Sequence, residues 1–148
     1  MNLRQIKQIR IEDLLERSPI NLNNDALAEE LKDKRILVTG ASGFIGKNLA
    51  CRLQELPNTQ VILFTRQENR EKLVELVATS DMVVHLAGVN RPDSETEFTY
   101  DNVDLTAAVC DAIRSSGRNI PIIFASSTQA NQSTSYGQSK KLAEQAVQ

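Results

Sequence analysis

Tyr136 and Lys140 lie four residues apart at the start of a predicted helix near the C-terminal end of the sequence. This spacing places both side chains on one face of the helix. A tyrosine that transfers a proton near pH 7 needs its pKa brought down from about 10. A nearby, partly desolvated ammonium favours this because it stabilises the phenolate. The pair is therefore a candidate acid–base site, although a tyrosine and a lysine at this spacing also occur by chance.

Three hydroxyl side chains precede this helix. Ser126, Ser127 and Thr128 follow a predicted strand over 120–124, at its C-terminal end. Open sheets of parallel strands place their binding sites at that end. A hydroxyl that hydrogen-bonds the same substrate oxygen as Tyr136 would complete a proton-transfer site.

A glycine-rich turn follows the first predicted strand, 36–38, and leads into a helix that Pro57 ends. In a dinucleotide-binding turn, the first glycine permits the tight turn and the second lets the backbone approach a pyrophosphate. The third lets the helix pack closely on the strand. The helix start then presents free N–H groups and a positive dipole end to the phosphates. The alternative is a purely structural turn. The predicted dinucleotide-binding residues here are Gly40, Ser42, Gly43, Phe44, Ile45 and Gly46.

The end of the second predicted strand, 61–64, is where such sites distinguish NAD from NADP. An acidic residue there would accept hydrogen bonds from a ribose 2′-hydroxyl, whereas an arginine suits a 2′-phosphate. The strand runs into Thr65 and Arg66, with Arg70 nearby and no carboxylate before Glu68. We therefore expect NADP(H) to be preferred over NAD(H), with Arg66 contacting the phosphate. A solvated loop arginine is the alternative.

Strands and helices alternate along the chain from residue 34. Short apolar, β-branched runs are typical of strands buried on both faces of a parallel sheet. Their alternation with helices favours right-handed crossovers. The predicted fold class is α/β, a Rossmann-like, doubly wound parallel sheet of about four strands. The expected strands cover 36–38, 61–64, 82–86 and 120–124; the expected helices cover 26–32, a segment ending at Leu56, 70–78, 103–113 and 136–148.

Composition and charge narrow the functional classes. The 148 residues carry a formal charge of −2, which provides no basic field for nucleic acid or anionic lipid. No apolar run approaches the ~20 residues that a membrane span needs, so we expect no membrane span. Cys51 and Cys110 lack metal-ligand spacing, and two lone thiols suit a reducing cytosol. We therefore expect a cytoplasmic protein without a metal site.

Together these residues resemble the nucleotide-sugar branch of the extended short-chain dehydrogenase/reductases. Beside the glycine turn, the resemblance rests on His85-Leu86-Ala87-Gly88, on Asn102-Val103 and on Tyr136-Gly137-Gln138-Ser139-Lys140. It covers residues 34–148, the expected NAD(P)-binding domain, and leaves 1–33 as an N-terminal linker segment. It implies that Leu86, Ala87 and Gly88 pass under the cofactor, and that Tyr136 and Lys140 also contact it.

A closer resemblance is to the capsular-polysaccharide reductases, which reduce a 4-keto-6-deoxy UDP-amino sugar with NADPH. It rests on His85–Pro92, on Ser126–Ala130 and on the nine-residue step from Ser127 to Tyr136. By this resemblance, Ser127 binds and polarises the keto oxygen and Tyr136 donates the proton. Lys140 stabilises the phenolate and holds the nicotinamide ribose. Asn90 and Arg91 would face cofactor and substrate, and a surface-loop role is the alternative.

Two departures from that family leave alternatives open. Residues Arg10–Leu15 resemble the linker of membrane-anchored nucleotide-sugar 4,6-dehydratases, and the chain stops just after the tyrosine helix. We therefore expect a truncated or hybrid chain without the substrate lobe, and an inactive fragment is one alternative. A non-catalytic dinucleotide-binding module is another. The resemblance also implies a possible homodimer through helices 103–113 and 136–147.

The enzymatic alternatives are a UDP-N-acetylglucosamine 4,6-dehydratase and a 4-epimerase. Dehydratases usually place an Asp-Glu pair directly after the hydroxyl residue. This sequence has Thr128 and Gln129 there, and neither exchanges a proton near neutral pH. The sequence therefore favours reduction over dehydration.

Overall fold

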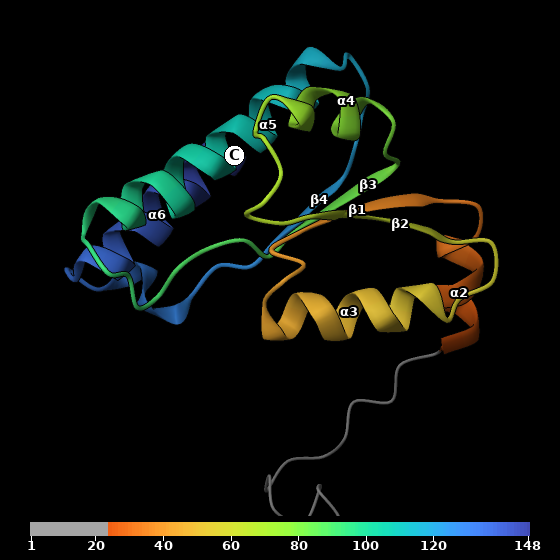
Figure 1. Ribbon diagram of the computed structural model, residues 1–148, viewed down its shortest axis with the longest axis horizontal. Helices are drawn as coiled ribbons and strands as arrows, with labels where there is room; N and C mark the ends of the chain where they lie inside the picture. The colour runs from red at the N-terminus through yellow and green to blue at the C-terminus, as the bar shows by residue number, and fades with distance from the viewer. Residues whose placement is uncertain (1–23) are drawn as a thin grey trace, which may run out of the picture. The chain divides into compact units, whose positions relative to one another are not determined.

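The computed structural model describes residues 24–148, and Figure 1 shows the arrangement of their helices and strands. The N-terminal motif Arg10–Leu15 lies outside these residues, and the predicted boundary at residue 33 stays a prediction. The elements in chain order are α2 (Asn24–Leu31), β1 (Arg35–Thr39), α3 (Phe44–Gln54), β2 (Gln60–Phe64), α4 (Lys72–Ala78), β3 (Met82–His85), the π-helical η1 (Phe98–Asp104), α5 (Leu105–Ser115), β4 (Ile122–Phe124), the 3-10-helical η2 (Thr128–Asn131) and α6 (Ser135–Val147).

The four strands found in residues 31–148 form one parallel sheet in the order β2-β1-β3-β4. The chain moves outward from β1 to β2 and then returns past β1 to β3. The carboxyl ends of β1 and β3 therefore flank the switch point at which doubly wound sheets bind their ligands. The predicted fold class, an α/β sheet of about four parallel strands, is confirmed.

Helices cover both faces of this sheet, because successive residues of a buried strand point to opposite sides. Ile36 and Val38 of β1 pack with Leu53 of α3 on one face. Leu37 points to the other face and packs with Val109 of α5 in a core that α4 also lines. Figure 1 shows α3 on one side of the sheet and α4 and α5 on the opposite side. The short apolar strands are thus buried from both faces, as their composition indicates.

Several elements differ from their predicted bounds by one or two residues, and two of the differences have a clear consequence. The fourth strand begins at Ile122 rather than at residue 120. Pro121 has no N–H to donate to the ladder, so only its carbonyl takes part, accepting from the Val83 N–H at 2.9 Å. The helix predicted over 103–113 is preceded by a π-helical segment, η1, which begins at Phe98. Such wide turns are frequent at functional sites, and this one brings polar side chains to the carboxyl edge of the sheet.

The segment between β4 and α6 contains a short 3-10 turn, η2. Ser127 has extended backbone and caps this turn, because its Oγ accepts from the Gln129 N–H at 3.2 Å. Thr134 caps α6 in the same way, accepting from the Gly137 N–H at 3.0 Å. Helix α6 therefore begins one residue before Tyr136. The two caps determine where the loop ends and the helix starts.

His85, at the end of β3, is fully buried and hydrogen-bonded at both ring nitrogens. Its Nδ1 lies 2.5 Å from Thr39 Oγ1, and its Nε2 lies 2.9 Å from Thr106 Oγ1. The Thr106 hydroxyl donates to the Asn102 carbonyl oxygen at 2.6 Å, so it accepts from Nε2–H of the ring. The Thr39 hydroxyl then donates to Nδ1. This chain of hydrogen bonds requires a neutral imidazole and ties β1, β3 and α5 together.

We expect the free energy of unfolding to depend on pH through His85. Burial, and secondarily the charge of Lys140, lower the pKa of His85 to about 4. In the unfolded chain, the imidazole of His85 takes up a proton near pH 6.5. The free energy of unfolding is therefore highest above about pH 6.5, and it falls as the pH decreases toward 4, by roughly 3 kcal/mol in all. Denaturant unfolding across this range measures the effect.

The His85→Gln variant is the control for this measurement. Glutamine keeps a donor and an acceptor but does not titrate, so its pH profile reports the carboxyl groups alone. Parallel wild-type and variant profiles between about pH 6.5 and pH 5 would contradict the role assigned to His85.

Candidate functional site

The glycine turn brings the end of β1 against the strand beside it. Gly40 has φ +70°, a left-handed conformation that glycine adopts without strain. A Cβ on Gly40 would lie 2.7 Å from the Ala87 backbone nitrogen. A Cβ on Gly46, one turn into α3, would lie 2.2 Å from the Gly40 carbonyl oxygen. Only residues without a side chain permit both contacts, so the turn packs directly on the backbone after β3, and the first turn of α3 packs directly on the glycine turn.

The start of α3 has the features of a phosphate site. Gly43 is the N-cap residue in extended backbone, and none of the described side chains caps the helix there. The first N–H groups of a helix lack partners within it, and they carry the positive end of the helix dipole. Phe44 and Ile45 are 85% and 65% exposed, so their side chains leave the backbone open to solvent. The turn therefore has the exposed backbone N–H groups that a pyrophosphate site needs, and binding there stays a prediction.

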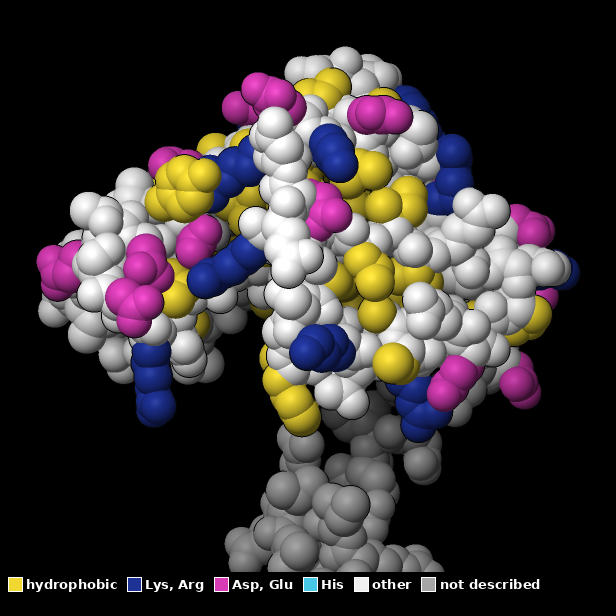
Figure 2. All heavy atoms as spheres, in the orientation of Figure 1, with side chains coloured by type: hydrophobic (Ala, Val, Ile, Leu, Met, Phe, Trp, Pro, Cys, Tyr) yellow, Lys and Arg dark blue, Asp and Glu magenta, His cyan; other side chains and the backbone are white. Residues whose placement is uncertain are grey.

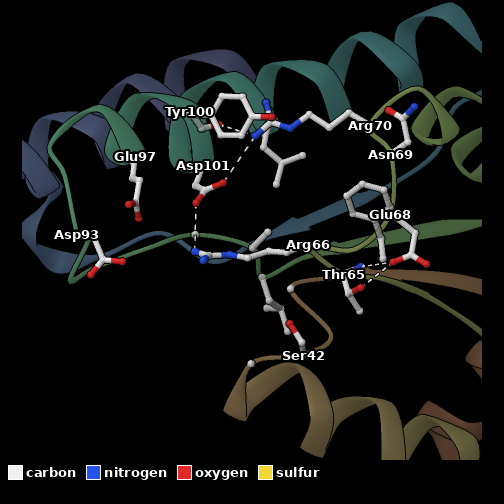
Figure 3. A pocket seen from close by; sticks show the side chains of 17 residues that line it. Ser42, Thr65, Arg66, Glu68, Asn69, Arg70, Asp93, Glu97, Tyr100 and Asp101 are labelled. Atoms are coloured by element: carbon white, nitrogen blue, oxygen red, sulfur yellow. Dashed lines mark hydrogen bonds and ion pairs between the residues drawn. The ribbon is translucent and has the colours of Figure 1, made fainter.

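A cleft of about 790 Å³ opens at the carboxyl edge of the sheet, beside this turn (Figure 3). It lies at the switch point between β1 and β3. Much of the predicted dinucleotide-binding set lines it: Gly40, Ser42, Gly43, Arg66, Leu86, Ala87 and Gly88. Phe44, Ile45 and Gly46 are outside this lining, since the first two point to solvent and the third is buried in the turn. The structure thus gathers three separate segments of the sequence around one cavity.

The far wall of the cleft carries charges of both signs. Arg66 Nη2 lies 3.1 Å from Asp101 Oδ2, and Arg70 Nη2 lies 3.6 Å from Asp101 Oδ1. The Arg70 guanidinium also lies over the Tyr100 ring, 3.5 Å from its centroid. Figure 3 shows both arginines reaching toward Asp101 from the loop after β2. On the face drawn in Figure 2, basic and acidic side chains are likewise interspersed rather than separated by sign.

Glu68, the first carboxylate after the second strand, is turned away from the arginines. It accepts hydrogen bonds from the Thr65 backbone N–H at 3.3 Å and from Thr65 Oγ1 at 2.6 Å. The hydroxyl hydrogen bond is the main reason that the pKa of Glu68 is lowered. Thr65 therefore holds the Glu68 carboxylate.

Lys140, from α6, lies beside Gly88 of the cleft lining but, like Tyr136, is not itself part of that lining. Its side chain is buried, and its Nζ donates to the Ala125 carbonyl oxygen at 3.0 Å. A Cβ on Gly88 would lie 3.1 Å from this Nζ, so the ammonium lies directly over the bare backbone after β3. Burial lowers the pKa of Lys140, and the charge of Glu144 opposes this shift. The ammonium is thus partly desolvated and sits beside the predicted cofactor path.

Asn102 is the residue that the sequence analysis did not assign to the site. It is 1% exposed. Its Oδ1 accepts from the Val89 N–H at 2.7 Å, and its Nδ2 donates to the Val89 carbonyl oxygen at 2.9 Å. The same Nδ2 donates to Ser139 Oγ at 2.9 Å. Asn102 therefore fastens the segment after Gly88 to α6, between Tyr136 and Lys140. A polar amide on the buried side of a helix is the sequence signal that could have indicated it.

Tyr136 and Ser127 lie on elements that pack together. Tyr136 is half-buried in the first turn of α6, with its ring centroid 6.0 Å from that of Phe98 in η1. Ser127 precedes η2, which packs against α6. The neighbouring Ser126 is engaged elsewhere, since its hydroxyl donates to Glu144. Of the three predicted hydroxyl residues, Ser127 is the half-buried one, while Ser126 and Thr128 are exposed.

The remaining predicted residues are on the surface. Asn90 and Arg91 are exposed in the segment that follows Val89. Cys51 and Cys110 are both free thiols, the first exposed and the second buried. The helices described, all within residues 24–148, fall short of the length and apolar character that a membrane crossing requires. The homodimer predicted through 103–113 and 136–147 stays a prediction.

Comparison with known proteins places this site in a family. Residues 36–148 match the model of the NAD dependent epimerase/dehydratase family. The UDP-2-acetamido-2,6-beta-L-arabino-hexul-4-ose reductase of Pseudomonas aeruginosa is 46% identical over 114 residues, which are 77% of this chain and 31% of that protein. Residues 36–148, which the family model matches, include the glycine turn, the segment after β3 up to Gly88 and the helix of Tyr136 and Lys140.

Solved structures with the same fold include two enzymes or assembly proteins of sugar metabolism, as their names state. The capsular polysaccharide assembling protein CapF of Staphylococcus aureus superposes with a TM-score of 0.62 at 39% identity, over 74% of this chain and 30% of that one. The UDP-glucuronic acid 4-epimerase of Bacillus cereus, at a TM-score of 0.65 and 19% identity, has the same fold over 76% of this chain and 50% of that one. The chain thus spans about a third of the length of its nearer relatives. The chain belongs to the NAD dependent epimerase/dehydratase family, which confirms the resemblance inferred from its motifs.

Proposed function

We propose that this chain is the NADPH-binding part of a nucleotide-sugar reductase that acts on a 4-keto-6-deoxy UDP-amino sugar in capsule or O-antigen biosynthesis. The observation that carries this proposal is the position of Lys140 over Gly88, at the end of a cleft that begins at the glycine turn. The relative with 46% identity is named as a reductase of a UDP-linked hexul-4-ose. Dinucleotide binding and proton donation thus share one edge of the sheet.

The cofactor would lie along the carboxyl edge of the sheet. The N–H groups at the start of α3 would bind its pyrophosphate, and the bare backbone of Gly88 would allow it to pass close to β3. Arg66 would contact a 2′-phosphate at the adenosine end, which supports NADP(H) over NAD(H). When bound, the cofactor supplies a hydride to the keto carbon.

The protein would supply the proton that the keto oxygen takes up. Tyr136 would donate it from its hydroxyl, and Ser127 would hydrogen-bond the same oxygen. The buried ammonium of Lys140, on the same face of α6, would stabilise the resulting phenolate and bind the nicotinamide ribose. Asn102 would keep the Gly88 segment and α6 in register through Val89 and Ser139. Asn90 and Arg91, exposed after Val89, would face the sugar nucleotide.

Dehydration of a UDP-sugar is the less supported reaction. It needs an additional acid and base next to the hydroxyl residue, and the two residues there, Thr128 and Gln129, are both exposed and unable to ionise near neutral pH. A dinucleotide-binding module without turnover is the alternative. Cofactor binding and turnover are therefore tested separately.

We expect NADPH to bind more tightly than NADH, and the Arg66→Ala variant to weaken NADPH binding by about tenfold or more with little change for NADH. A charge-assisted hydrogen bond to phosphate accounts for a loss of that size. Isothermal titration calorimetry with both cofactors measures it. The Arg52→Ala variant is the control, because Arg52 is an exposed arginine paired with Glu55 on α3. Tighter binding of NADH by the unmodified chain would overturn the cofactor assignment.

We expect the Tyr136→Phe variant to lose about 10²- to 10⁴-fold in reduction of the keto sugar, because a positioned proton donor contributes that much. Phenylalanine keeps the ring next to Phe98, so cofactor affinity should fall far less than the rate of reduction. NADPH oxidation in the presence of the 4-keto-6-deoxy UDP-amino sugar measures the rate. Undiminished reduction by the variant contradicts the role of Tyr136, and NADPH binding without turnover by the unmodified chain supports the binding-module alternative.

A further inference from the structure

Asp101 is the carboxylate that holds the arginines of the cleft. It comes from η1, 35 residues beyond Arg66, and is 17% exposed. One of its oxygens lies 3.1 Å from Arg66 Nη2 and the other 3.6 Å from Arg70 Nη2. Both oxygens thus face a guanidinium. The carboxylate is far from the strand end in sequence, where a cofactor-discriminating acid is normally sought.

The two arginines are held to different degrees. Arg70 is 27% exposed, donates to the Tyr100 carbonyl oxygen at 2.8 Å and lies over the Tyr100 ring. Arg66 is 71% exposed and meets Asp101 at the open side of the cleft. An exposed ion pair of this kind contributes little free energy, roughly 0–1 kcal/mol, so a ligand can exchange it. Arg66 is therefore the guanidinium that a bound anion would draw away from Asp101.

We infer that Asp101 sets the strength of the preference for NADPH over NADH, by competing with the 2′-phosphate for Arg66. This inference rests on the proposed NADPH-binding function. A phosphate group carries nearly two negative charges and three acceptor oxygens, so it outcompetes one carboxylate but must first break the existing pair. Asp101 then remains beside the phosphate as a like charge. NADH lacks the 2′-phosphate, so its affinity does not depend on this exchange.

Other acidic groups of the cleft provide a matched comparison. Asp93 and Glu97 also line the cavity, on its η1 side (Figure 3). Removing the charge of Asp93 changes the field in the cleft but leaves the contacts between Asp101 and the two arginines in place. The Asp93→Asn variant therefore reports general electrostatic repulsion, whereas Asp101→Asn reports repulsion together with release of Arg66.

The experiment measures dissociation constants of NADPH and NADH for the full chain and for Asp101→Asn, Asp93→Asn, Arg66→Ala and the double variant Arg66→Ala/Asp101→Asn. We expect Asp101→Asn to tighten NADPH binding about fivefold, the size of one exposed ion pair, with less than about a twofold change for NADH. The Asp93→Asn variant should give a clearly smaller gain in NADPH affinity. In the Arg66→Ala background, the gain from Asp101→Asn should fall to the level of the Asp93 control. Thermal unfolding checks that each variant is folded.

The outcomes separate this inference from the function on which it rests. If Arg66→Ala leaves the ratio of the two affinities unchanged, the proposed NADPH preference fails. If Arg66→Ala weakens NADPH but Asp101→Asn does not tighten it, the preference stands and the role of Asp101 is overturned. Weaker NADH binding by Asp101→Asn would also overturn it, because Asp101 would then be accepting from a ribose hydroxyl.

Discussion

Direct backbone packing at the carboxyl edge of the sheet is the constraint on which the rest of this structure depends. The turn after β1 rests against the backbone after β3 at Gly40 and Ala87, and the first turn of α3 rests against the Gly40 carbonyl. The same bare backbone continues to Gly88, where the Lys140 ammonium approaches. A side chain at any of these points would separate the elements. Their absence leaves a continuous surface of backbone on which a flat, charged ligand fits closely.

Buried polar groups then determine how the helices sit on that edge. His85, Asn102 and Lys140 are each buried, and each has hydrogen-bond partners on a different element. Within residues 24–148, every buried side-chain nitrogen and oxygen has a partner. An unsatisfied polar group in the interior costs about 1–3 kcal/mol, so a displaced helix would lose several such contacts at once. The network therefore selects one arrangement of β3, η1 and α6.

The cleft has a floor of packed backbone and a wall of charged side chains. The glycine turn and the Lys140 contacts are made largely of backbone and buried groups. The charged wall, by contrast, has an exposed arginine, Arg66, whose ion pair with Asp101 lies near solvent. Buried pairs resist exchange because breaking them leaves an uncompensated charge, whereas exposed pairs exchange at little cost. In the proposed function, packing determines where the cofactor lies along the cleft, and charge determines the selectivity at its adenosine end.

The sequence by itself determined the local features. The glycine spacing, the alternation of short apolar strands with helices, and the placement of Tyr136 and Lys140 on one helix face follow from periodicity and backbone conformation within a few residues. These predicted the parallel sheet, its four strands and a site at the carboxyl ends of its strands. The fourth strand was shortened only by the missing N–H of Pro121, a local effect.

Only the tertiary structure determined which residues far apart in the sequence contact one another. Asp101 meets Arg66 across 35 residues, Asn102 meets Ser139 across 37, and Lys140 meets Ala125 across a 3-10 turn absent from the predicted elements. No periodicity in the sequence encodes these pairs, because each depends on how far the π-helical segment turns and how α6 docks against it. The acid that faces Arg66 is therefore Asp101, while Glu68, close in sequence, is held by Thr65. Contacts between distant segments arise from packing, and packing is a property of the whole sheet and its helices.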